Sequence, residues 1–258
     1  MHIPFHKYQG TGNDFIMLDN RQGNLPAFSA QQISQLCHRR FGIGADGLII
    51  VQPKAGYDFE MIYYNSDGSQ SLCGNGSRCA VRFAQEQGYI QEKAHFLAYD
   101  GPHEAHIQGE IVHLAMADVA ETRQLEADTF FINTGSPHHI CFVNALHDYE
   151  VVSKGRAIRY SDTYKMAGTN VNFVEKKAPS SLFVRTYERG VENETLSCGT
   201  GVTAASLAAA IQGASSPVVV ETLGGKLSVS FVRQPNGRFT DIWLIGPAVK
   251  VFEGIITQ

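Results

Sequence analysis

The chain has 258 residues, of which 43% are hydrophobic and 18% are charged, as in an ordinary globular protein. This length is sufficient for two domains, each with its own core. A net charge of −4 argues against nucleic-acid and anionic-membrane partners, because both require a basic face. The sequence also lacks an apolar run long enough to span a bilayer, so we expect neither nucleic acid nor membrane as a partner.

The cysteines indicate the compartment. Their number is odd, and the first twenty residues, which include His2, Lys7 and Asp14, do not resemble a secretion signal. Reduced thiols in a cytoplasmic protein are the expectation from such a pattern. The cysteines are Cys37, Cys73, Cys79, Cys141 and Cys198.

Predicted elements of the first half alternate between strands and helices. Residues Ser29–Arg40 should form a helix with Ser29 as its N-cap. A strand, Phe59–Tyr64, precedes a polar loop and the segment Cys73-Gly74-Asn75-Gly76. A small, Ala-containing helix, Ser77–Gln87, should follow and end at a glycine. Alternating polarity then predicts strands within His103–Met116.

The second half repeats this order. A Gly-containing turn again enters an apolar strand, at Asn133–Ile140, and a strand is predicted at Leu182–Tyr187. The segment Cys198-Gly199-Thr200-Gly201 then precedes a predicted helix, Val202–Gln212, and alternating strands within Gly225–Leu244. The two cysteine segments lie about 125 residues apart, which indicates a duplicated domain rather than a short repeat.

The polar run Asp118–Gln124 interrupts the apolar pattern between the halves. We therefore predict an N-terminal half over residues 1–117 and a C-terminal half over 118–247. The fold class is α/β of the α+β type, and the alternation of polarity favours antiparallel sheets.

Each of the two repeated cysteines precedes a predicted helix N-terminus. Such a position lowers a thiol pKa and attracts anions. Two equivalent thiols suggest one site with an acid on one side and a base on the other, as stereochemical inversion at carbon requires. Cys37, Cys79 and Cys141 lie in apolar surroundings and are expected to be buried.

Two other motifs do not support a cofactor or a metal. Residues Gly42–Gly47 match the dinucleotide-binding pattern, but they follow a helix and open a strand, which is the reverse of the required order. Cys73, Cys79, His138 and His139 lack the spacing of a zinc site. We predict neither a cofactor nor a metal.

Polar residues near the cysteine segments fit an amino-acid ligand. Glu188 and Arg189 offer a carboxylate for an ammonium group and a guanidinium for a carboxylate, although a surface ion pair has the same composition. The asparagines at matching places in the halves could bind substrate or form turns. They are Asn13, Asn65, Asn75 and Asn170.

Over nearly its whole length the chain resembles the diaminopimelate epimerase family. The segments that carry the resemblance include both cysteine segments and several glycine- and asparagine-containing turns. They are Gly12–Phe15, Gly42–Gly47, Asn65–Gly68, Cys73–Gly76 with Arg78-Cys79, Gly168–Phe173, Tyr187–Gly190 and Cys198–Gly201.

The resemblance implies two similar domains, each an antiparallel sheet wrapped around a central helix, with the active site in the cleft between them. It implies that residues 248–258 complete the first domain. The implied reaction, which serves lysine and peptidoglycan precursor synthesis, interconverts LL- and meso-diaminopimelate without a cofactor, with Cys73 and Cys198 as the two bases. The implied substrate-binding residues are Asn13, Asn65, Gly74, Asn75, Asn170, Glu188, Arg189, Gly199 and Thr200, with His138 in support.

Two alternatives remain open at this point. One is a racemase of the same fold that acts on proline or another amino acid. The other is a non-catalytic amino-acid binding protein whose cysteines sense redox state. The expected partners are a small amino-acid substrate and a second copy of the chain in a homodimer.

Overall fold

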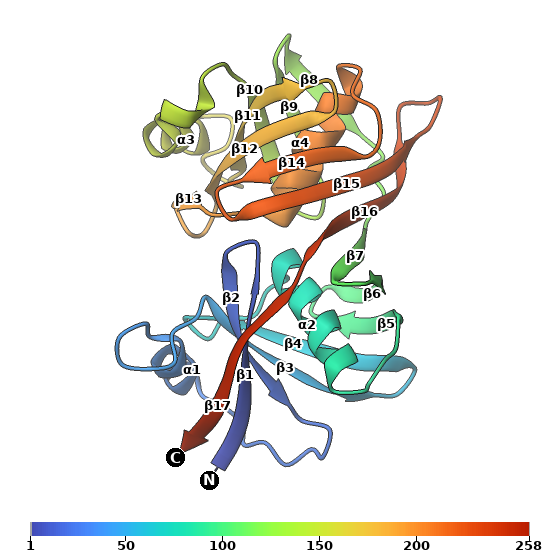
Figure 1. The fold of residues 1–258 in the computed structure, drawn as a ribbon. Coiled ribbons are helices and arrows are strands. Elements are labelled where there is room, and N and C mark those ends of the chain that lie inside the picture. Colours follow the sequence, from blue (N-terminus) through green and yellow to red (C-terminus); the bar gives the residue numbers. More distant parts are fainter. Residues whose placement is uncertain (1, 258) are drawn as a thin grey trace. The chain divides into compact units, whose positions relative to one another are not determined.

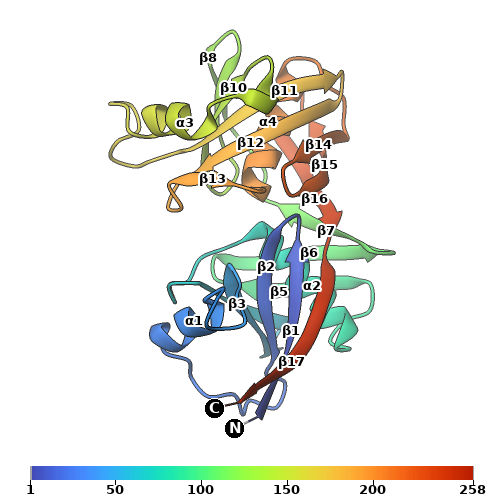
Figure 2. The ribbon, with the colours of Figure 1, turned by 60° about the vertical axis from the view of Figure 1, so that its left-hand side comes forward.

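The computed structural model describes residues 2–257. It divides into two compact units, one formed by the chain up to Leu114 and from Gly246 onward, and one by Ala115–Ile245 (Figure 1). In both views each unit has strands surrounding one helix, α2 (Gly74–Glu86) in the first unit and α4 (Gly199–Ile211) in the second (Figure 2).

The first unit places its strands in the order β17-β1-β2-β3-β4-β5-β6-β7. Helix α1 connects β2 to β3, and α2 connects β4 to β5, and both of these strand pairs are parallel. The elements are β1 (His2–Gly10), β2 (Asn13–Asp19), α1 (Ala30–Cys37), β3 (Gly47–Lys54), β4 (Tyr57–Asn65), β5 (Lys93–Ala98), β6 (Gly101–Gln108), β7 (Ile111–Met116) and β17 (Val249–Thr257).

The second unit has the same order, β8-β9-β10-β11-β12-β14-β15-β16, with short β13 beside β12. Its parallel pairs, β10 with β11 and β12 with β14, again span the helices α3 and α4. The elements are β8 (Thr122–Glu126), β9 (Thr129–Asn133), β10 (Pro137–Phe142), a 3₁₀ turn (Leu146–Asp148), α3 (Val151–Arg159), β11 (Asn170–Ala178), β12 (Ser181–Glu188), β13 (Asn193–Thr195), β14 (Val218–Thr222), β15 (Gly225–Arg233) and β16 (Phe239–Pro247).

The matching pairings confirm the duplication predicted from the cysteine segments. The expectation of antiparallel sheets holds for most neighbours, but each sheet is mixed. Parallel pairs occur where a helix carries the chain back to the end of the sheet at which the previous strand began, because a parallel connection needs such a crossover. The alternation of polarity did not reveal them: β3 and β11 begin with five buried residues in a row, whereas β5 and β14 alternate just as antiparallel strands do.

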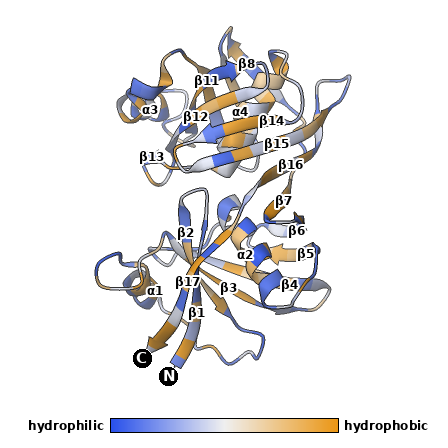
Figure 3. Ribbon diagram, viewed as in Figure 1, coloured by the Kyte–Doolittle hydropathy of each residue, from blue (hydrophilic) through white to orange (hydrophobic). Residues whose placement is uncertain are grey.

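Helices α2 and α4 both begin three residues earlier than the sequence predicted, so the glycines of the cysteine segments belong to the first turn. Helix α4 contains only apolar and small residues, whereas α2 carries hydrophilic side chains in its second half (Figure 3). A helix with no polar face is stable only when other elements cover it. Of the helices in the part of the chain that the structure describes, none is long and apolar enough to cross a membrane.

Candidate active site

Each repeated cysteine is the N-cap of the central helix of its unit. Cys73 and Cys198 have extended backbones, with φ and ψ of −134° and 112° and of −120° and 110°. The Gly76 N–H donates to Cys73 Sγ over 3.4 Å. Because the N–H groups of the first helical turn have no acceptor within the helix, both sulfurs lie where partial positive charge concentrates.

The second glycine of each cysteine segment lies in close packing, which leaves no room for a Cβ atom at Gly201 and little at Gly76. A Cβ atom at Gly201 would lie 2.3 Å from Asn172 Nδ2, and one at Gly76 would lie 3.2 Å from Ile49 Cδ1. The helices therefore approach the strands beneath them closely at the first turn, which fixes the position of each cysteine over its sheet.

In the first unit, a chain of side-chain amides connects the helix to the β1–β2 turn. Asn75 Nδ2 donates to Asn13 Oδ1 over 2.9 Å, and Asn13 Nδ2 donates to Asp46 Oδ2 over 2.6 Å. The Asp46 carboxylate also accepts from Arg39 over 2.6 Å. The predicted residues Asn13 and Asn75 thus lie together, in fixed orientations, at the start of α2.

The corresponding network in the second unit starts at the cysteine itself. Cys198 Sγ lies 3.5 Å from Thr200 Oγ1, which is 3.0 Å from His138 Nε2. His138 Nδ1 lies 2.8 Å from Asn172 Oδ1, and Asn172 Nδ2 donates to Thr186 Oγ1 over 2.8 Å. The structure therefore connects the predicted residues Cys198, Thr200 and His138.

This network determines where the imidazole proton lies. Since Asn172 uses its amide nitrogen toward Thr186, its oxygen accepts from His138 Nδ1–H. His138 Nε2 is then an acceptor for the Thr200 hydroxyl, whose oxygen can accept from the Cys198 thiol. Burial lowers the pKa of His138 to about 4, with a smaller contribution from the positive charge of Arg189 and an opposing one from Asn172. His138 is neutral at physiological pH.

Two other predicted asparagines have partners close by in the chain. Asn65 Nδ2 donates to the Ser69 carbonyl and to the hydroxyls of Ser69 and Ser71. Asn170 Nδ2 donates to Ser136 Oγ over 2.9 Å, and Asn170 Oδ1 accepts from the Arg189 backbone N–H over 2.9 Å. Both residues therefore organise loops in addition to any role toward a ligand.

Glu188 is the last residue of strand β12 in the second unit, and Arg189 follows it in the turn. The Arg189 guanidinium donates to the Ala167 carbonyl over 3.0 Å, and its Cδ lies 2.6 Å from where a Cβ of Gly168 would be. The absence of a side chain at Gly168, which has φ of +75°, allows the arginine to cross the loop. Arg189 and Asn170 are thus part of one cluster.

Some polar residues around the cysteines were not assigned a role from the sequence. They are Thr11, Asp46, Arg78, Asn172 and Thr186. Asn172 could have been found, because it lies two positions after Asn170 on one strand and so faces the same side. Burial raises the thiol pKa of the other three cysteines, Cys37, Cys79 and Cys141, to about 11 for Cys37 and Cys141.

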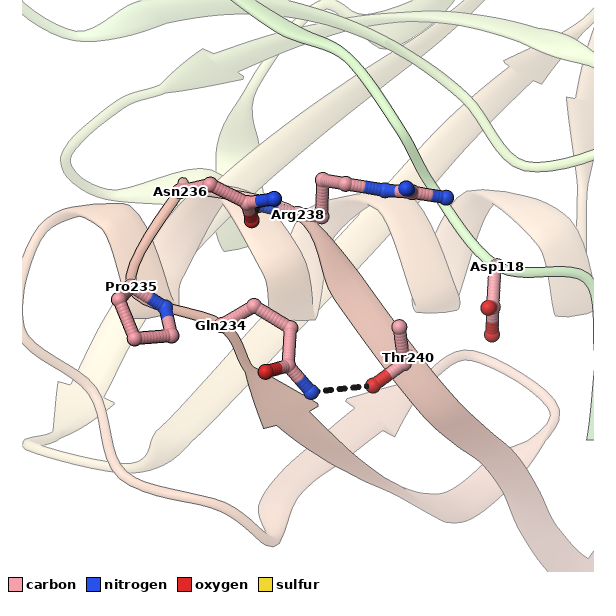
Figure 4. A pocket seen from close by; sticks show the side chains of 6 residues that line it. All are labelled: Asp118, Gln234, Pro235, Asn236, Arg238 and Thr240. Carbon is pink, nitrogen blue, oxygen red and sulfur yellow. Dashed lines mark hydrogen bonds between the residues drawn. The ribbon is translucent and has the colours of Figure 1, made fainter.

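A cavity of about 530 Å³ in the second unit shares no residue with these clusters. It lies at the tip of the β15–β16 hairpin and is lined by Asp118, Gln234, Pro235, Asn236, Arg238 and Thr240 (Figure 4). The neighbouring Arg233 donates to the Ala210 carbonyl at the last turn of α4, the end opposite Cys198. Among the described residues, no group of three or more His, Cys, Asp or Glu side chains could hold a metal ion.

The fold has a clear structural relative. A Bacillus anthracis phenazine biosynthesis protein of the PhzF family has a TM-score of 0.78 to this chain, with 14% identity and full coverage of both chains. At that identity the likeness defines the fold class, two similar α/β units each with a central helix.

The sequence comparisons define the family. A family model described as diaminopimelate epimerase matches residues 5–121 and 130–251. Diaminopimelate epimerase of Flavobacterium psychrophilum is 51% identical, over 98% of this chain and the whole relative. That of Chlorobaculum tepidum is 44% identical, over 96% of this chain and 99% of the relative. The chain belongs to the diaminopimelate epimerase family.

The neutral His138 should make the protein less stable in acid. Its folded pKa of about 4 lies below its usual value of 6.5, so the unfolded chain takes up a proton between these values while the folded chain does not. The stabilisation that the neutral His138 gives to the folded protein is fully present above pH 6.5. It decreases as the pH falls toward 4 and stays constant below that value. Between pH 7 and pH 5 the free energy of unfolding should fall by roughly 2 kcal/mol.

Urea unfolding at both pH values measures this effect. His138→Gln should reduce the difference in the free energy of unfolding between pH 7 and pH 5 by roughly 2 kcal/mol, whereas the exposed His147→Gln should leave it unchanged. An equal acid response in wild type and His138→Gln would contradict the assignment of a neutral buried imidazole.

Proposed function

We propose that the chain uses Cys73 and Cys198 as the two acid–base groups that interconvert LL- and meso-diaminopimelate without a cofactor. The enzyme is an isomerase of the diaminopimelate epimerase family, and its product serves lysine biosynthesis. The observation that supports the roles of the cysteines most directly is their equivalence: each is the N-cap of the central helix in one of two units with the same topology.

The difficult step is removal of the Cα proton, and the proposed chemistry needs a base and an acid on opposite faces. One cysteine, as thiolate, forms an S–H bond as the Cα–H bond breaks. The other, as thiol, delivers its proton to the opposite face. The substrate leaves with inverted configuration, and the two sulfurs have exchanged protonation states.

Negative charge develops on the substrate carboxylate during this transfer. The first-turn N–H groups of α2 and α4, including those of Gly74, Asn75, Gly199 and Thr200, are oriented before the reaction begins. We assign them to this charge, because donors fixed in advance need no reorganisation in the transition state.

The remaining polar residues would recognise the rest of the substrate. The side-chain amide oxygens of Asn13, Asn65 and Asn170 each accept one hydrogen bond within their own unit. A carbonyl oxygen has two lone pairs, so each of these oxygens keeps one for a ligand, and Asn13, whose amide nitrogen donates only to Asp46, also keeps one N–H. Glu188 with Arg189 offers one charge of each sign. His138, connected to Cys198 through Thr200, supports the thiol.

Replacing either cysteine should abolish epimerisation. Cys73→Ala and Cys198→Ala each remove one of two obligatory groups, so each should reduce turnover of LL-diaminopimelate to background. Cys141→Ala, which changes a thiol outside both networks, should retain most activity. Chiral chromatography of the product measures the rates. Substantial activity in either Cys73→Ala or Cys198→Ala would contradict the two-base assignment.

Substrate choice separates this function from the alternatives. A site that hydrogen-bonds a second amino-acid centre leaves polar groups unsatisfied with a smaller ligand, so discrimination against proline, alanine and lysine should be about 10³-fold or more. Rates on these compounds and on LL-diaminopimelate measure it. Faster turnover of proline would indicate a proline racemase, and binding without turnover of any of them would indicate a binding protein.

We also propose a cytoplasmic homodimer, since the reaction needs reduced thiols and one sheet edge is uncovered. Strand β17 pairs with β1, and no other described strand pairs with it in the first unit. It exposes Val249, Val251, Phe252 and Ile255, and Figure 3 shows its hydrophobic colouring. An exposed apolar edge strand is a template for pairing with another chain.

Light scattering after size exclusion tests the dimer. Val251→Glu places a charge on this edge and should yield a monomer, whereas Val232→Glu, an exposed valine on β15 in the second unit, should not. A wild-type protein that is monomeric at micromolar concentration would contradict the proposal.

A further inference from the structure

Arg78 is a fully buried cation near the start of α2. Its Nη2 atom donates to Asn75 Oδ1 over 3.0 Å and to Thr11 Oγ1 over 3.1 Å. Its Nε and Nη1 atoms are buried and have no hydrogen-bond partner within residues 2–257. A Cβ at Gly10 would lie 3.5 Å from Nη2, so the backbone of the β1–β2 turn lies directly against the guanidinium.

This charge lacks the compensation that other buried cations of the protein have. The buried Lys7 pairs with Asp14 at 2.7 Å, and even the half-buried Arg185 pairs with Glu194 at 2.6 Å. No ion pair in the described chain includes Arg78, and both of its acceptors are neutral oxygens. A guanidinium remains charged even when buried, and an uncompensated buried charge costs several kcal/mol.

The helix increases this cost. The N-terminus of α2, toward which the guanidinium extends, carries partial positive charge of its own. The guanidinium charge and the partial charge of the helix N-terminus repel each other in this buried region unless an anion lies nearby. The surroundings of Arg78 must therefore supply a negative charge that the network of neutral side chains does not.

The carboxylates on the strands packed against α2 are already engaged. Asp14 on β2 pairs with Lys7 and Arg39, Asp19 with Arg21, and Glu60 on β4 with Lys54. Asp58 accepts from the His95 backbone, and Asp46, which contacts the amide chain, pairs with Arg39.

The other titratable groups of these elements are neutral or distant from the helix start. Tyr8 on β1 bonds to Glu86 at the far end of α2, and burial lowers the pKa of His6. The tyrosines of β4 and His2 on β1 carry no carboxylate. Burial strongly raises the thiol pKa of Cys79. Cys73, the N-cap of the same helix, remains.

We propose that Arg78 is a positioning residue that holds Cys73 in its thiolate form, as the buried counter-charge of that sulfur. The inference rests on the proposed function, because it assigns one of the two protonation states that the reaction requires. Electrostatic coupling between Arg78 and Cys73 supports it, since negative charge at Cys79 and at Cys73 raises the guanidinium pKa against the lowering by burial.

The second unit shows why the two thiols should differ. The residue five positions after Cys198 is Thr203, whose hydroxyl donates to the Gly199 carbonyl over 3.0 Å, so α4 has no buried cation at this position. Its cysteine instead contacts Thr200, which leads to the neutral His138. The resting enzyme therefore holds a thiolate at Cys73 and a thiol at Cys198.

Site-resolved alkylation tests the inference. The full-length protein is treated briefly with iodoacetamide across pH 5–10, and peptides containing Cys73 and Cys198 are quantified by mass spectrometry. In wild type the midpoint for Cys73 should lie below that for Cys198. Arg78→Met should raise the Cys73 midpoint by about one pH unit or more, since a nearby opposite charge shifts a pKa by that amount. Arg78→Lys should restore part of the shift.

Arg82→Met is the matched control, because Arg82 lies one turn further along α2 and pairs with Glu86 at its outer side. It should leave both midpoints unchanged, and Arg78→Met should leave that of Cys198 nearly unchanged. In kinetics Arg78→Met should lower kcat more than it raises KM. Melting temperatures identify variants that do not fold. If Arg78→Met does not fold, the inference is tested by the order of the Cys73 and Cys198 midpoints in wild type and by the Cys73 midpoint in Arg78→Lys.

A Cys73 midpoint at or above that of Cys198 in wild type would overturn the inference, as would an unchanged Cys73 midpoint in folded Arg78→Met. Wild-type protein that fails to epimerise diaminopimelate would instead contradict the proposed function, whatever the alkylation profiles show. The two failures are therefore distinguishable.

Discussion

The rest of the structure depends on the enclosure of one helix in each unit by the strands of that unit. Helices α2 and α4 are covered along most of their length, and eleven residues of α4 are buried. An enclosed helix satisfies its backbone internally except at its ends, where N–H groups still need acceptors. A cysteine followed by a glycine stands at the N-terminal end of each helix. The unpaired N–H groups there therefore lie beside a thiol and point toward the space that a ligand would occupy. The duplicated topology then supplies two such sites.

The two units use the same plan with different chemistry. In both, the residue two positions after the cysteine contacts the first residues of a strand that lies beneath the helix, Asn75 with Asn13 and Thr200 with His138. The first network ends on charged groups, Asp46 and Arg39, and includes a buried guanidinium, whereas the second consists of neutral groups. This difference in surroundings is the basis on which we assign the thiolate to Cys73 and the thiol to Cys198.

The sequence predicted the duplication, the central helices and the cysteine caps, because glycine, alanine and alternating polarity have local causes. It did not predict α3, a short helix with few buried residues. Nor did it predict the parallel strand pairs, since alternation identifies a strand without giving the direction of its neighbour, and β3, with five buried residues in a row, lacks alternation as well. Asn13 and Asn75 were identified as site residues, but their bond to each other and to Asp46 was not, because that contact joins three segments distant in the chain. Arg78 was part of a recognised motif, yet only its burial and unmet donors show that it is more than a surface arginine.

The central claim is that two different cysteines act on opposite faces of one carbon. The most direct measurement is early-time turnover of LL-diaminopimelate in deuterium oxide, with the isotopic content of substrate and product determined separately. A two-base enzyme gives meso product that carries deuterium at the inverted carbon, while the remaining LL substrate keeps its original hydrogen. Deuterium that enters the remaining substrate as fast as the product, or product that retains the original hydrogen, would contradict the account.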